Sequence, residues 1–189
     1  MTDYRSARSL GERIQGARKA RGMSARELAE AIGGVPSQST IENIELGRKA
    51  AIDVVQLLNI AMALRVPLSY LLAPIGNPDA PLDLPGLSKE FSSMSAIEFD
   101  AWLSGISDGS RIPTSLDERN AFAELQALRE WRTRTAETSR LETMLELERS
   151  ALNSTEGLYL RSTEERLTES RREVERLARL LRSAGWPVK

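Results

Sequence analysis

The residues best suited to specific chemistry lie in one short stretch, Ser37–Lys49, which reads SQSTIENIELGRK. Amide and hydroxyl side chains surround an isoleucine pair there, Ile41 and Ile44. Asparagine and glutamine can pair two-pronged with the edge of an adenine, and serine can donate to or accept from a base. The stretch ends with Gly47 and two cations, Arg48 and Lys49, and such cations neutralise phosphates. The side chains of this stretch can therefore form hydrogen bonds and ion pairs.

The composition argues against catalytic and metal chemistry. The 189 residues include no cysteine and no histidine, so no disulfide, thiolate nucleophile, imidazole base or zinc-finger site can be built. The sequence also lacks a phosphate loop of the G-x-x-x-x-G-K-[ST] type and a nucleophile–base constellation. A Ser–Lys peptidase domain would need a strand pattern, which residues 74–189 do not have. We therefore expect no enzyme activity, no cofactor and no metal.

The net charge of −1 hides a segregation along the chain. Residues 1–73 carry 10 basic and 7 acidic groups, residues 74–114 carry 2 and 6, and residues 115–189 carry 14 of each. The N-terminal excess hints weakly at a nucleic-acid partner. No apolar run approaches the roughly 20 residues of a membrane span, and the first residues lack the apolar core of a signal peptide. We expect a cytoplasmic protein without a membrane partner, and the lack of cysteine is compatible with that compartment.

The polar stretch belongs to a predicted N-terminal domain of five short helices over residues 9–72, within a domain 1–73. Five amphipathic helices of this length can share one small core. Helix starts are marked by N-cap residues and a proline, and helix ends by glycines. These signals are Ser24 with Glu27 three residues later, Ser37, Asp53, Pro67, Gly22 and Gly47.

The third helix, 37–46, has the shape that the major groove of B-DNA admits. Ile41 and Ile44 anchor it inward, and its outward side carries candidates for base contacts: Gln38, Ser39 and Asn43. Candidates for phosphate contacts are Ser37, Thr40, Arg48, Lys49 and Arg26. Arg26 equally suits ordinary surface. Glu42 would repel phosphate unless it faces a cytosine amine or packs back on the domain, and solvated support is the simpler interpretation.

Residues 9–73 resemble the helix-turn-helix domain of the phage-repressor superfamily (Cro/CI type, XRE). The resemblance is carried by LGERIQGARKARGMSARELAEAI, SQSTIENIELGRK and LLNIAMALRVPLSYLLAP. It implies that helices two and three form the helix-turn-helix pair and that Gln38, Ser39 and Asn43 occupy base-reading positions. It also implies a structural ion pair between Arg18 and Glu45, which we prefer to the alternative role of Arg18 as a phosphate contact. The turn IGGVPS is longer than the family's usual form.

Residues 74–115 have the composition of a linker. The segment APIGNPDAPLDLPGLS holds four prolines and two glycines. One short helix over 95–104 is predicted inside it, with a capping box formed by Ser95 and Glu98. Phe99 and Trp102 supply apolar surface there, which indicates a satellite core rather than a ligand cage.

Residues 116–189 are predicted to form a long antiparallel helical hairpin or coiled coil, which makes the fold all-α. Apolar residues recur in heptads from Leu160 to Leu181, and NSTEG at 153–157 marks the break between two helices. The hairpin would pair residues 116–152 with 158–184. Its arginines alternate with glutamates, which indicates a solvated face rather than a nucleic-acid surface. We expect a homodimer or a partner protein to bind through 116–184.

Two functions from different classes remain open on the sequence. The first is a sequence-specific transcription regulator on double-stranded DNA, of the prophage or mobile-element repressor type. The second is an XRE-type antitoxin or interaction protein, whose C-terminal helices cover a partner and whose DNA binding is autoregulatory.

Overall fold

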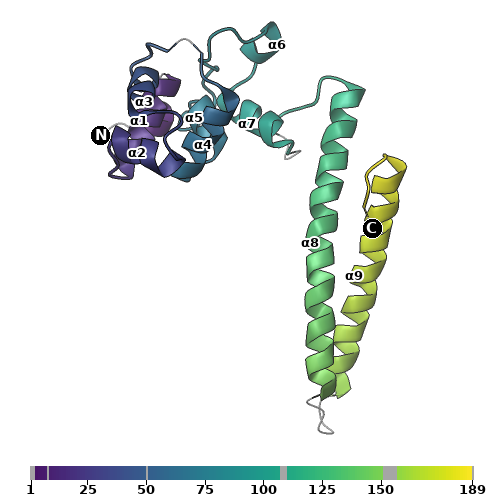
Figure 1. Cartoon of the computed structure of the whole chain (residues 1–189). Helices are drawn as coiled ribbons and strands as arrows, with labels where there is room; N and C mark the ends of the chain where they lie inside the picture. The colour runs from purple at the N-terminus through teal and green to yellow at the C-terminus, as the bar shows by residue number, and fades with distance from the viewer. Residues whose placement is uncertain (1–2, 8, 50, 107–109, 151–156, 189) are drawn as a thin grey trace. The chain divides into compact units, whose positions relative to one another are not determined.

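The computed structural model in Figure 1 describes residues 3–7, 9–49, 51–106, 110–150 and 157–188. Within these ranges the regular elements are helices, apart from one isolated bridge between Pro81 and Ser95, so the all-α prediction is confirmed. The chain divides into two compact units. One extends to Ser104, and the other contains Gly105 and the residues from Ile112 onward.

The five predicted N-terminal helices are present. They are α1 (Leu10–Ala20), α2 (Ala25–Ile32), α3 (Gln38–Glu45), α4 (Val54–Leu64) and α5 (Leu68–Leu72), preceded by a short 3-10 helix, η1 (Tyr4–Ser6). At α2 the capping box is complete: the Ser24 hydroxyl accepts from the Glu27 N–H, and the Glu27 carboxylate accepts from the Ser24 N–H at 2.7 Å. This backbone hydrogen bond lowers the pKa of Glu27.

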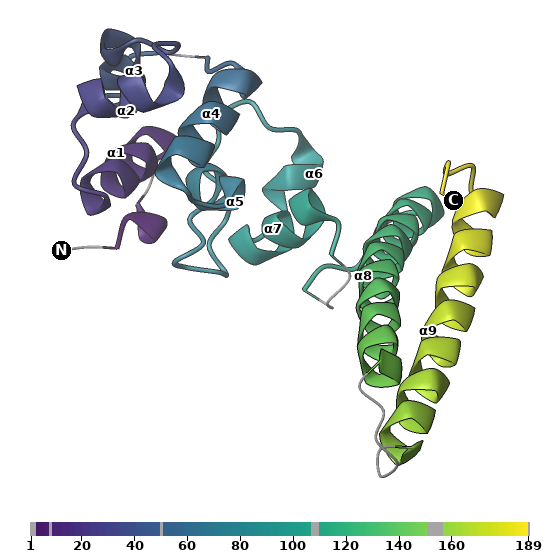
Figure 2. The same cartoon turned by 60° about the horizontal axis from the view of Figure 1, so that its bottom comes forward.

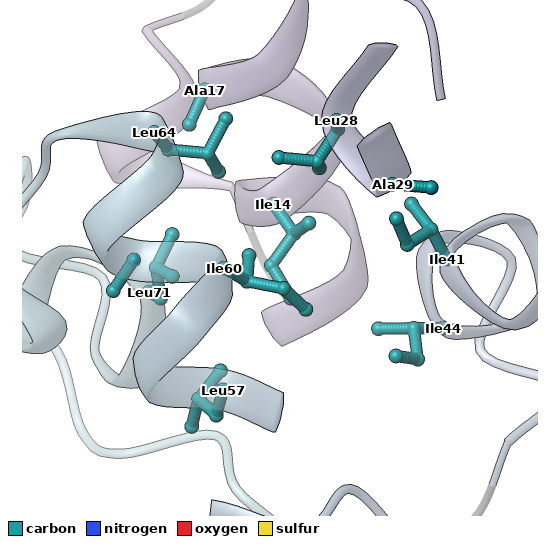
Figure 3. Packing of buried hydrophobic residues seen from close by; sticks show 11 residues of the cluster. Ile14, Ala17, Leu28, Ala29, Ile41, Ile44, Leu57, Ile60, Leu64 and Leu71 are labelled. Carbon is teal, nitrogen blue, oxygen red and sulfur yellow. The ribbon is translucent and has the colours of Figure 1, made fainter. Parts of the chain in front are cut away.

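One core joins these helices, and Figure 3 shows side chains from all five converging on it. Ile14 and Leu28 are fully buried, as is Ile41 of the polar helix. The α4 residues Leu57, Ile60 and Leu64 close the core from the other side. The apolar anchors predicted for α3 therefore belong to the domain core and hold that helix in place.

The short helix predicted over 95–104 is present as α7 (Ala96–Ser104), with its capping box of Ser95 and Glu98, whereas the packing of residues 73–104 against the N-terminal helices was not predicted. These residues also include α6 (Lys89–Ser92), and they pack in the same unit as α1–α5. A second apolar cluster forms around buried Ala73, Ala96 and Phe99, with Phe91 and Trp102 against it. The proline-rich stretch is thus held by packing, because aromatic and aliphatic side chains along it contact one another in this second cluster.

An arginine adds a polar attachment between this segment and α1. The Arg13 side chain is 0% exposed and contacts the Asp83 carboxylate through two nitrogens, Nη1 to Oδ2 at 2.6 Å and Nη2 to Oδ1 at 2.8 Å. Its other donors reach the carbonyls of Ala7, Leu71 and Leu72. Every polar group of the buried guanidinium is therefore matched, as a buried charge requires.

The second unit contains the predicted antiparallel hairpin of α8 (Leu116–Ser150) and α9 (Gly157–Ser183), which lie side by side in Figures 1 and 2. The direction follows from contacts at both ends: Trp186 Nε1 donates to Glu124 at 3.0 Å, and Arg149 donates to Glu164 at 2.8 Å. Of the predicted turn 153–157, only Gly157 lies within the described residues, and it begins α9.

The interface between α8 and α9 contains two apolar clusters with a polar contact between them. Leu141, Leu145 and Leu167 form one cluster, and Ala127, Leu177 and Leu181 form another. Between the clusters, Thr138 and Ser170 share a hydrogen bond at 2.7 Å. Arg171 pairs with Glu142 across the hairpin, and Arg176 pairs with Glu173 along α9. These ion pairs agree with the interpretation of a solvated face.

Candidate nucleic-acid interface

Helix α3 begins and ends where the sequence predicts. The Ser37 hydroxyl accepts from the Thr40 N–H at 3.4 Å. At the other end Gly47 has a φ of 66°, a left-handed conformation that glycine adopts without the strain of a Cβ. The chain then turns back, because the carbonyl of Asn43 accepts from the N–H groups of Arg48 (2.9 Å) and Lys49 (3.2 Å). Both cations are thereby fixed by their backbone next to the end of the helix.

Helix α3 rests directly on α1 at a buried glycine. A Cβ built at Gly11 would collide with the carbonyl oxygen of Ile44, and it would lie 2.9 Å from that of Glu45. No side chain fits between these backbones. Gly11 therefore sets how closely the C-terminal turn of α3 approaches α1, a role that the sequence pattern did not reveal.

An ion pair joins the same two helices. Arg18 donates through Nε and Nη2 to the two carboxylate oxygens of Glu45, both at 2.6 Å, and through Nη1 to the Met23 carbonyl at 2.7 Å. The two side chains are 11% and 3% exposed. The hydrogen bonds that Arg18 donates to Glu45 raise the pKa of Arg18. Core packing, Gly11 and this bidentate pair together fix α3 on the domain.

The three candidates for base contacts, Gln38, Ser39 and Asn43, are all exposed on α3, opposite the buried Ile41 and Ile44. Gln38 is held in place by its own helix, because its Nε2 donates to Glu42 Oε1 at 2.9 Å. Glu42 thus has a partner that sequence reasoning missed, although the i, i+4 spacing was the available signal. One N–H and the carbonyl oxygen of the Gln38 amide remain outside this bond.

The candidates for phosphate contacts differ in how they are held. Arg26 is exposed on α2 and donates to Glu30 at 2.8 Å, and Lys49 donates to Gln56 of α4 at 2.9 Å. Arg48 is exposed beyond the end of α3. The hydroxyls of Ser37 and Thr40 lie 3.0 Å apart at the start of α3. All five candidates lie on α2, on α3 or directly before or after α3.

A shallow hollow runs between the start of α2 and the exposed side of α3. It is lined by Gln15, Arg18, Ser24, Ala25, Arg26, Gln38, Glu42, Glu45 and Leu46. Arg26 of α2 and Gln38 of α3 therefore line the same hollow. Five residues, Gly33–Ser37, connect the two helices. This arrangement presents polar donors and acceptors from two successive helices.

Comparison with known proteins gives one match. Residues 14–71 match the family model described as helix-turn-helix, a family of DNA-binding regulators. No curated protein and no solved structure matches the chain. In the described residues, no group of three or more acidic side chains is placed to hold a metal ion, and none of the helices has the length and apolar character to cross a membrane.

Proposed function

Residues 14–71 form a helix-turn-helix domain of the XRE (Cro/CI) type, and from this premise we propose that the chain is a sequence-specific transcription regulator that reads the major groove of double-stranded DNA with α3. The observation that carries the proposal is the division of α3 into two faces. Ile41 and Ile44 are buried at 0% and 2% exposure, while Gln38 and Asn43 are exposed. A helix entering the groove needs this combination of inward anchor and outward hydrogen-bonding groups.

Contacts to the phosphate backbone are assigned to residues around the groove-reading helix. Ser37 and Thr40 lie at the start of α3, where helix N–H groups favour an anion. Arg48 and Lys49 follow its end, and Arg26 lies across the hollow on α2. These groups position the domain without reading sequence.

The proposal is tested by comparing two sets of variants. Gln38→Ala or Asn43→Ala should cost about 1–3 kcal/mol at a specific site and relax the preference at one base pair. Arg48→Ala should weaken binding on all sequences alike and lower the salt slope by about one. Each variant is titrated against an operator and a scrambled duplex at two salt concentrations. The operator is first found by footprinting DNA that flanks the protein's own gene.

The contrast between the two duplexes decides the outcome. If Gln38→Ala and Asn43→Ala lose the same affinity for operator as for scrambled DNA, α3 does not read bases. A Ser150→Ala variant on α8 serves as the control, because its exposed hydroxyl lies in the other unit.

Glu42 offers a separate prediction, since it both orients Gln38 and adds negative charge to the groove-facing helix. Glu42→Gln keeps an acceptor for Gln38 and should raise affinity for operator and scrambled DNA in equal proportion. Glu42→Ala also removes the acceptor, so the ratio of the two affinities should fall by up to about fivefold, the worth of one hydrogen bond of about 1 kcal/mol. The same titrations measure both effects, and an unchanged ratio for Glu42→Ala would contradict the orienting role.

The finer assignment is a repressor of prophage or mobile-element type, acting where the DNA lies, in the cytoplasm or nucleoid. The hairpin would then bind a second copy or a partner protein rather than DNA, because its arginines are engaged by glutamates. Arg171, Arg176 and Arg182 each pair with a glutamate of the hairpin. Footprinting near its own promoter, with transcription measured in a strain lacking the gene, tests the repressor role. Unchanged transcription from a bound promoter would argue against repression.

A further inference from the structure

Helix α4 is apolar on both of its faces. One face, with Leu57, Ile60 and Leu64, closes the domain core (Figure 3). The opposite face also carries large apolar side chains, and these are exposed: Val54 at 64%, Val55 at 59%, Leu58 at 48% and Met62 at 78%. Their spacing of i, i+1, i+4 and i+8 places them in one stripe along the helix. We call these four residues the α4 stripe.

A helix that is apolar all round is normally covered on all sides. The two polar residues of α4 leave the α4 stripe uninterrupted, since Gln56 is occupied by Lys49 at 2.9 Å and Asn59 lies beside the stripe rather than in it. Single exposed apolar residues are common on protein surfaces, whereas contiguous ones mark interaction sites. The α4 stripe therefore calls for a partner surface.

We propose that the α4 stripe binds the α4 stripe of a second copy of this chain, with the two helices antiparallel across a two-fold axis near Leu58. In this arrangement Leu58 meets Leu58 of the second copy. The long, flexible Met62 of each helix meets the short side chains of Val54 and Val55 of the other. Large side chains thus face small ones, as close packing at an isologous contact requires.

The charges at the two ends of α4 also favour a second copy as the partner and an antiparallel arrangement of the two helices. Asp53 caps the start of α4, and exposed Arg65 follows its end. Antiparallel pairing brings each Asp53 end beside an Arg65 end and opposes the two helix dipoles favourably. Parallel pairing would place like charges together. The α4 stripe and the charges at its two ends are therefore complementary to those of a second copy related by a two-fold rotation.

The size of the contact indicates how strongly it acts. Four side chains supply much less than the roughly 800 Å² per partner of a standard stable interface, so the contact alone is weak. The self-association does not depend on DNA. Its consequence for a two-half-site operator rests on the proposed function: DNA that holds two domains side by side would raise their effective concentration and populate the contact.

Disulfide trapping in the full chain without DNA tests the contact, because the natural sequence contains no cysteine. Leu58→Cys should form a covalent dimer under mild oxidation, since each Leu58 faces its counterpart. Val55→Cys and Met62→Cys should cross-link poorly alone and efficiently when the two proteins are mixed. Val35→Cys, 67% exposed in the same unit but outside the α4 stripe, is the control and should stay monomeric. Cross-linking of Leu58→Cys no faster than that of Val35→Cys would overturn the proposal.

Light scattering of the full chain at about 100 μM gives a second measurement that needs no new cysteine. Leu58→Arg should raise the dissociation constant of the dimer at least about tenfold, because it buries two unpaired charges at the axis. Val35→Arg, at an exposed position of the same unit outside the α4 stripe, should leave that constant unchanged. Either a wild-type monomer at this concentration or a dimer insensitive to Leu58→Arg would exclude the α4 contact.

Discussion

Arg13→Ala is expected to lower the free energy of unfolding of the N-terminal unit by about 3–5 kcal/mol. The substitution removes a guanidinium that is 0% exposed and that contacts both carboxylate oxygens of Asp83 and three backbone carbonyls. Those carbonyls lose donors in a site from which water is excluded, and such unmatched groups are costly. Denaturant unfolding measures the change. In a background carrying Trp131→Phe and Trp186→Phe, the fluorescence of Trp102 reports this unit alone.

Two acidic residues of the same segment serve as controls for this prediction. Asp83→Asn leaves the fully buried Arg13 guanidinium without a counter-charge and turns an amide NH2 toward one of its nitrogens, so its cost should be similar, about 3–5 kcal/mol. Asp79→Asn alters an exposed acid four residues earlier, and it should change stability by less than about 0.5 kcal/mol. A loss below about 1 kcal/mol for Arg13→Ala would show that the segment 73–104 is attached by its apolar cluster alone.

Glu45→Ala is expected to cost a similar amount, about 3–5 kcal/mol, because it strands the Arg18 guanidinium in a site where the pair is 11% and 3% exposed. The substitution should also weaken DNA binding, because the ion pair holds the C-terminal turn of α3 against α1. Binding to operator should therefore weaken even at temperatures where the domain remains folded. Denaturant unfolding and operator titration measure the two effects.

A double substitution separates the pair from its surroundings. Arg18→Met with Glu45→Met removes both charges and should recover most of the stability that Glu45→Ala loses. Glu42→Ala, on the same helix but exposed, should change stability by less than about 0.5 kcal/mol. A Glu45→Ala variant as stable as the wild type would mean that the ion pair contributes nothing to holding α3.

The helices of the N-terminal domain were predictable because their signals are local. Ser24, Ser37 and Asp53 each cap a helix within three residues, and Ile41 and Ile44 fall on one face by spacing alone. The hairpin followed from the heptads between Leu160 and Leu181 and from the polar, glycine-containing break that precedes them. In the candidate site, the outward position of Gln38, Ser39 and Asn43 was a consequence of the same periodicity.

The attachment of residues 73–104 was not predictable, since its polar anchor joins positions 70 apart in the chain. An arginine next to Ile14 in an amphipathic helix has the local pattern of a surface residue, and a run of prolines has that of a linker. Gly11 was missed for a related reason, because the close approach it permits involves the backbone of a helix more than thirty residues later. Long-range contacts of this kind leave no local periodicity.

The attachment of Arg13 to Asp83 also imposes an order on biosynthesis. Helices α1–α5 leave the ribosome before Asp83 does, so Arg13 emerges ahead of the carboxylate that it pairs with in the folded unit. Domains fold as units during synthesis, and a unit that lacks one element exposes surface to proteases and chaperones. The N-terminal unit is therefore complete only when residues 73–104, which the matched helix-turn-helix residues 14–71 do not contain, have been added to it.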